Sequence, residues 1–79
     1  MNSDIATELE SLIILKTNIQ SSYELGLVSF CLQNHPQVET WNVDEEDVDK
    51  VIRIQLKQPA FEQDYVQLLC SLGLNAEPF

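Results

Sequence analysis

The stretch LIILKTNIQSSYELGLVSFCLQN, residues 12–34, decides the fold because its apolar period changes partway along. Over residues 12–19 one face carries alternate residues, as in a strand: Ile13, Leu15, Thr17 and Ile19. Over residues 22–34 the apolar positions recur at helical spacing: Leu25, Val28, Cys31 and Leu32. The stretch therefore predicts a strand followed at once by a helix.

The start of this helix has a specific chemistry. Ser21 or Ser22 is a good N-cap, and with Ser21 as the cap Glu24 follows three residues later, which is the spacing of a capping box. A carboxylate in the first turn also suits the positive end of the helix dipole. The pair His35-Pro36 ends the helix, because the residue before a proline is disfavoured in the α region.

The segment after this helix reads as a hairpin. Residues 38–43 predict a second strand, with Trp41 and Val43 on one face. Residues 44–50, DEEDVDK, form a polar connection, and residues 51–56 predict a third strand. The segment KQPA, residues 57–60, predicts a break.

A second helix is predicted over residues 61–72, with Gly73 placed as a helix C′ glycine, and a short last strand around residues 74–77. The inward side of this helix is predicted to hold Phe61, Tyr65, Leu68, Leu69 and Leu72. The order β-α-β-β-α-β predicts an α+β, ferredoxin-like sandwich, with a four-stranded antiparallel sheet and two helices on one face. The domain spans residues 11–79, after an acidic lead over residues 1–10 that is either disordered or holds one helical turn.

Charge narrows the classes of partner. Thirteen acidic residues against four basic ones give a formal net charge of −9. This balance excludes nucleic acid and anionic membrane surfaces, which attract Lys and Arg. An electropositive protein or a cation remains compatible. The sequence also lacks an apolar run of about 18 residues and the order of a secretory signal, so we expect a cytoplasmic protein.

The chain resembles the heavy-metal-associated, copper-chaperone-like domains over roughly residues 12–77. The resemblance rests on the strand LIILKTNI, the helix from Ser22, the segment HPQVETWNVD, and the segments KVIRIQL and LLCSLGLNAE. Ile19 matches the apolar residue, usually methionine, two positions before the first metal cysteine of that family. The turn departs from the family pattern, with Gln37 in place of glycine.

The family's M-x-C-x-x-C motif is replaced here, since Ser21 and Glu24 occupy the two cysteine positions. Soft ions such as Cu(I) prefer thiolates, whereas a hydroxyl and a lone carboxylate are poor ligands for them. The resemblance thus implies the fold of a metal carrier without its thiolate site. We expect Ser21 and Glu24 to cap the helix rather than hold a metal ion.

Other side chains in the sequence are also of the types that bind metal ions. Cys31 and His35, at i and i+4, offer an alternative Cu or Zn site, with a third ligand lacking nearby. Cys31 and Cys70 are expected to be buried as small apolar side chains. The segment DEEDVDK fails the pattern of a calcium loop, since Val48 and Asp49 stand where an oxygen ligand and glycine are required.

No nucleophile with a local orienting partner and no glycine-rich phosphate loop is present, which predicts a protein that is not an enzyme and has no cofactor. The expected role is a small binding or adaptor domain that meets a protein partner. The alternative is a divergent heavy-metal carrier that uses Cys31, His35 or carboxylates. The candidate partner-binding residues are Ser21, Tyr23, Glu24 and Trp41.

Overall fold

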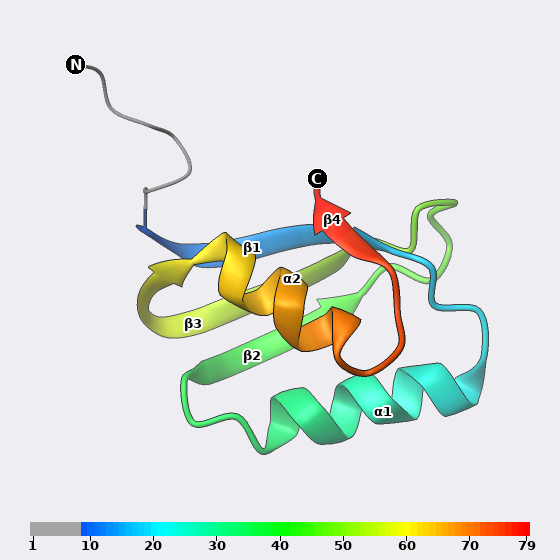
Figure 1. Cartoon of the computed structure of the whole chain (residues 1–79), viewed down its shortest axis with the longest axis horizontal. Helices are drawn as coiled ribbons and strands as arrows, with labels where there is room; N and C mark the ends of the chain where they lie inside the picture. The colour runs from blue at the N-terminus through cyan, green and yellow to red at the C-terminus, as the bar shows by residue number, and fades with distance from the viewer. Residues whose placement is uncertain (1–8) are drawn as a thin grey trace.

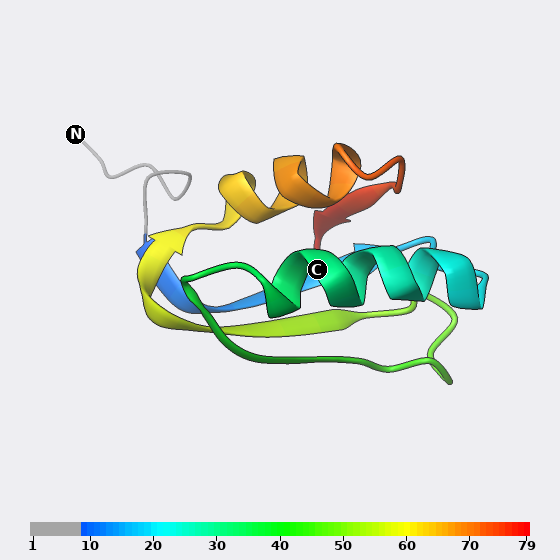
Figure 2. The ribbon, with the colours of Figure 1, turned by 90° about the horizontal axis from the view of Figure 1, so that it is seen from below.

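The computed structural model describes residues 9–79 and contains six elements. Their order is β1 (Leu9–Thr17), α1 (Ser22–Gln33), β2 (Val38–Val43), β3 (Ile52–Phe61), α2 (Glu62–Cys70) and β4 (Ala76–Pro78). The four strands form one antiparallel sheet in the order β2-β3-β1-β4, and the two helices lie on one of its faces (Figures 1 and 2). The predicted ferredoxin-like α+β arrangement is confirmed.

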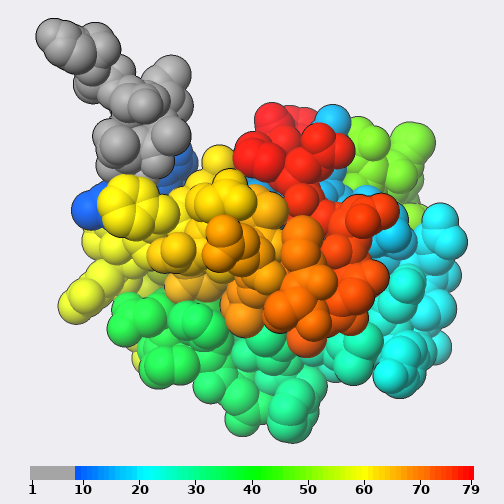
Figure 3. Space-filling view, in the orientation of Figure 1, coloured from blue at the N-terminus to red at the C-terminus, as the bar shows by residue number. Residues whose placement is uncertain are grey.

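The core lies between the sheet and the two helices. In the space-filling view, the side chains of α1 and α2 meet and cover most of this face of the sheet (Figure 3). The register places Ile13 of β1 opposite Ile54 of β3 and Leu15 opposite Ile52, and all four side chains are fully buried. The helices contribute Val28, Leu32, Tyr65, Val66 and Leu69. Each such aliphatic side chain stabilises the fold by about 1.5–3 kcal/mol relative to exposure.

β1 begins three residues earlier than predicted and ends two residues earlier. Leu9 and Glu10 pair with Phe61 and Ala60 of β3, so the end of the predicted acidic lead belongs to the sheet. The rest of that lead, residues 1–8, lies outside the described residues. At the other end, Thr17 turns to the β2–β3 hairpin, since its Oγ1 donates to the Lys50 carbonyl at 2.7 Å.

The predicted break at residues 57–60 is wrong, because β3 runs through this segment to Phe61. Leu12 pairs with Gln55, and Glu10 pairs with Ala60. Between these two pairs β1 has one residue and β3 has four, so the extra residues form a bulge in β3. Pro59 lies within this bulge, where its missing N–H costs no ladder hydrogen bond.

α2 is shorter than predicted, and two of its inward positions differ. Phe61 is the N-cap position and is exposed, because its backbone still belongs to β3. Val66, which the predicted stripe omitted, is buried beside Tyr65. After the helix, Gly73 has a φ of 91°, a left-handed conformation that favours glycine. β4 then starts at Ala76, two residues after the buried Leu74.

Candidate functional site

The β1–α1 junction, where the resemblance would place metal cysteines, is a capped helix start. Ser21 has an extended backbone, and its Oγ accepts a hydrogen bond from the Glu24 N–H at 3.1 Å. The Glu24 Oε1 accepts from the Gln20 N–H at 2.8 Å. The predicted cap is confirmed, with the difference that the carboxylate reaches the residue before the N-cap. Both side chains thus bind backbone donors of this junction.

A hollow of about 200 Å³ lies beside this cap. Its lining residues come from two segments that are distant in sequence: Ile19, Gln20, Ser21, Ser22 and Leu25, with Glu45 and Lys50. The hairpin side is held in shape by Lys50, whose Nζ donates to the Glu45 carbonyl at 2.6 Å. The β1–α1 loop and the β2–β3 hairpin therefore form one continuous end of the molecule.

Each of the two segments that line this hollow also exposes a large apolar side chain. Tyr23 follows Ser22 and is 74% exposed, and Val48 lies between Glu45 and Lys50 and is 79% exposed. The hairpin also exposes the carboxylates of Glu45 and Glu46. We call Tyr23, Val48, Glu45 and Glu46 the loop-end surface.

The hairpin has the internal hydrogen bonds of a solvated turn. The Glu46 N–H donates to the Asp44 Oδ1 at 3.3 Å, and the Asp49 N–H donates to the Asp47 Oδ1 at 2.9 Å. Such side-chain bonds to the backbone two residues later are typical of Asx turns. Two of its carboxylates therefore order the turn itself.

The alternative metal pair lies at the opposite end of α1. The Nδ1 of His35 accepts from the Gln37 N–H at 3.2 Å, and its ring packs against Tyr65 with centroids 5.4 Å apart. His35 is half-buried. Burial raises the pKa of the Cys31 thiol, which disfavours the thiolate that a metal ion requires. Within residues 9–79, no three His, Cys, Asp or Glu side chains gather as a metal site.

The cysteine prediction is partly wrong. Cys31 is half-buried, whereas Cys70 is exposed. The buried residues of α2 are Tyr65, Val66 and Leu69, and Cys70 is turned about 100° from Leu69 at the last position of the helix. Both thiols are free.

Trp41, the remaining candidate for partner binding, is half-buried in β2 and packs against the core. It does not line the hollow at the loop end. Of the candidate residues, the structure groups Ser21, Tyr23 and Glu24 at the start of α1 and leaves Trp41 apart.

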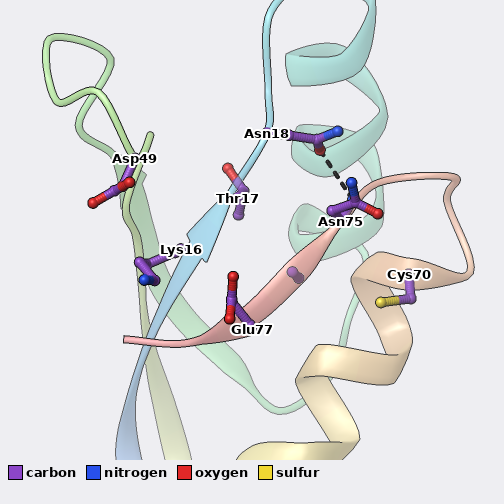
Figure 4. Close-up of a pocket in the computed structure, with 8 residues that line it drawn as sticks. Lys16, Thr17, Asn18, Asp49, Cys70, Asn75 and Glu77 are labelled. Atoms are coloured by element: carbon purple, nitrogen blue, oxygen red, sulfur yellow. Dashed lines mark hydrogen bonds between the residues drawn. The ribbon is translucent and has the colours of Figure 1, made fainter.

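A larger hollow of about 380 Å³ was not predicted from the sequence. It is lined by Lys16, Thr17, Asn18, Asp49, Cys70, Asn75, Ala76 and Glu77. In Figure 4, Lys16 lies between Asp49 and Glu77, and the Asn75 N–H donates to the Asn18 Oδ1 at 2.9 Å. No sequence pattern could indicate it, because its residues meet only through the pairing of β1 with β4 and the position of the hairpin. Its open, polar lining is that of a solvated surface hollow.

Comparisons with models of known protein families, with curated proteins and with solved structures find no match to this chain. The helices within residues 9–79 are too short or too polar to cross a membrane.

Proposed function

We propose that this chain is a non-catalytic adaptor domain that binds a positively charged protein through the loop-end surface. The observation that carries this proposal is that the two segments lining the hollow each expose an apolar side chain, Tyr23 and Val48, and that the hairpin also exposes the carboxylates of Glu45 and Glu46. Exposed aromatic residues commonly anchor protein interfaces. The resemblance to heavy-metal-associated domains supports the proposal. The sequence is similar to their strands and helices but has Ser21 and Glu24 in place of the two metal cysteines, so a binding role other than thiolate metal transport is favoured.

The chemistry of this surface favours a partner with Lys or Arg near apolar residues. A guanidinium or ammonium group can lie over the Tyr23 ring, and the Glu45 and Glu46 carboxylates can pair with further cations. The formal net charge of −9 adds long-range attraction for such a partner and increases the association rate at low salt. A cytoplasmic location is part of this proposal.

The rival function is that of a divergent Cu or Zn carrier that uses Cys31, His35 or carboxylates. Its test is a titration of the reduced protein with Cu(I) and Zn(II) against a competing chelator, repeated with Cys31→Ser. We expect weak binding that does not change in the variant. Submicromolar binding that is lost in Cys31→Ser would favour the carrier over the adaptor.

The adaptor function is tested with a partner isolated on the immobilised domain from the native lysate and then purified. Its affinity is measured by calorimetry for the unmodified domain, for Tyr23→Ala/Val48→Ser, and for Phe30→Ala. Phe30 is a matched control, because it is 73% exposed and lies on the same helix outside the loop end. We expect the double variant to lose at least about tenfold in affinity, as anchor residues do. Equal affinities for all three proteins would contradict the proposed surface.

A further inference from the structure

Among residues 9–79, no strand covers the outer edge of the sheet along the first half of β1. β4 pairs with β1 only from Leu15 to Thr17, and the Phe79 N–H extends this contact to the Ile14 carbonyl at 3.2 Å. β1 begins at Leu9, so β4 lies beside only one end of it (Figure 1). Within residues 9–79, no strand pairs with Leu9 to Ile13 on this side.

The direction of the backbone groups follows from these bonds. In an antiparallel ladder, the N–H and C=O of one residue point to the same side, and successive residues alternate. The Ile14 carbonyl faces β4, whereas the Ser11 carbonyl faces β3, where it accepts from the Gln55 Nε2 at 3.1 Å. Leu12 and Glu10 therefore direct their backbone N–H and C=O groups to the uncovered side, where a further strand can bind them.

A groove of about 290 Å³ runs beside these backbone groups. It is lined by Glu10, Leu12, Ile14, Glu62, Pro78 and Phe79, and we call it the β1 edge groove. Leu12 is 43% exposed and Phe79 is 70% exposed. Leu9 and Phe61, which pair across β1 and β3, are also exposed. The groove thus combines apolar side chains with backbone hydrogen-bonding groups that pair with no strand of the described part of the chain.

The other edge of the sheet, β2, is less suited to a further strand. The register shifts between Val38 and Thr40, which places a bulge at Glu39 in the edge strand itself. Bulges and charged side chains of this kind protect edges from pairing. The irregularity between β1 and β3 instead lies in β3, so the β1 edge stays regular from Glu10 to Thr17.

We propose that the β1 edge groove binds an extended segment of a partner protein as a fifth strand, and that this segment alternates apolar residues with Lys or Arg. Strand addition derives affinity from main-chain hydrogen bonds and specificity from alternate side chains. The charged side chains that line the groove are two carboxylates, Glu10 and Glu62, which select a cationic strand. The formal net charge of −9 disfavours a second copy of this chain as the occupant.

This binding mode goes beyond the proposed function, because the β1 edge groove shares no residue with the loop-end surface. The probe is a terminally blocked peptide of about six residues that alternates Val and Lys, a length that matches the segment from Leu9 to Ile13. Its binding to the ¹⁵N-labelled full chain is followed by NMR. We expect shifts of the Glu10, Leu12 and Ile14 amides and slower hydrogen exchange of the Leu12 N–H.

Variants of the domain and of the peptide test the contributions of the groove carboxylates and of the main-chain hydrogen bonds separately. Glu10→Lys/Glu62→Lys is expected to weaken peptide binding by about fivefold or more, on the scale of two exposed ion pairs. Glu39→Lys on the β2 edge is the matched control and is expected to reduce affinity much less. Two further peptides are N-methylated at every second residue, one at the odd and one at the even positions. The peptide whose methylated amides face β1 should no longer bind, whereas the other peptide should still bind.

Four results would overturn the proposal: no shifts at millimolar peptide, shifts centred on β2 or the loop-end surface, equal binding of a Val/Glu peptide, or unchanged binding of both N-methylated registers. Self-association of the chain that Leu12→Lys abolishes, with the folded spectrum retained, would assign the groove to a second copy instead. Tyr23→Ala/Val48→Ser should leave peptide binding unchanged, so the groove and the loop-end surface can fail independently.

Discussion

Replacing Ser21 by alanine is the sharpest test of whether the β1–α1 junction is a helix cap. Ser21 is exposed, and its hydroxyl accepts the Glu24 N–H, so the substitution removes a capping bond without removing core packing. Loss of such a cap costs about 1 kcal/mol in the free energy of unfolding. In a domain of this length, about 1 kcal/mol lowers Tm by about 4–8 °C.

The partner change is Glu24→Gln, which keeps an oxygen able to accept from the Gln20 N–H but removes the charge from the first helical turn. We expect a loss of about 0.3–1 kcal/mol that decreases at high salt, because the charge–dipole interaction is screened. Thermal and urea unfolding of both single variants and of the double variant complete a mutant cycle. The two effects are expected to be non-additive, because both act on the same helix start.

The reasoning fails if Ser21→Ala and Glu24→Gln are both as stable as the unmodified chain. It also fails if either variant lowers a measurable affinity for Cu(I) or Zn(II), since the residues would then be ligands. The converse variant, Ser21→Cys/Glu24→Cys, should be less stable than the unmodified chain without metal and should bind Cu(I) tightly through two thiolates. If this variant binds Cu(I) no better than the unmodified chain, the family resemblance at this junction is contradicted.

Three further outcomes are expected. Leu69→Ala should lower the free energy of unfolding in urea by about 2–5 kcal/mol, whereas Phe30→Ala should change it by less than about 0.5 kcal/mol; similar losses would contradict the assigned core. Gly73→Ala should lower the free energy of unfolding by about 1–2 kcal/mol, because its φ of 91° disfavours a side chain. No neighbour lies within 4 Å of the added Cβ, so the backbone conformation alone sets this cost. An unchanged free energy of unfolding would contradict this turn. At about pH 8, iodoacetamide should alkylate Cys70 before Cys31, because burial raises the Cys31 pKa, and the Cys31 rate should rise only at higher pH; the reverse order in a mass spectrum would contradict this assignment.

The elements that the sequence predicts well depend on signals within a few residues. The start of α1 follows from the spacing of Ser21 and Glu24, and its end from the pair His35-Pro36. The bounds of β2 were predicted because turn residues flank it on both sides. These bounds of α1 and β2 do not depend on the rest of the fold.

The errors occur where a distant segment decides the outcome. The segment at residues 57–60 reads as a break, yet it continues β3 because Leu9 and Glu10 extend the sheet beside Phe61 and Ala60. The same pairing holds Phe61 in the strand, although its apolar side chain fits the helical stripe. Sequence periodicity cannot include a pairing between residues about 50 positions apart.

The candidate surfaces divide in the same way. The cap at Ser21 was predictable, since it needs one short segment. The meeting of the β1–α1 loop with the hairpin could not be predicted in detail, because it depends on how β1 and β3 align. The β1 edge groove was still less accessible, because it exists only where β4 is too short to cover β1.

The two carboxylates of the β1 edge groove bear on both self-association and the choice of partner. An exposed, regular edge with apolar side chains favours pairing with any chain that offers a strand, including another copy of itself. Two copies paired along this edge would each bring Glu10 and Glu62 to the shared interface, where repulsion between these carboxylates would oppose the association. A strand with Lys or Arg at alternate positions would instead neutralise these carboxylates. If the groove binds such a strand, the same two carboxylates would both oppose self-pairing and favour a cationic partner.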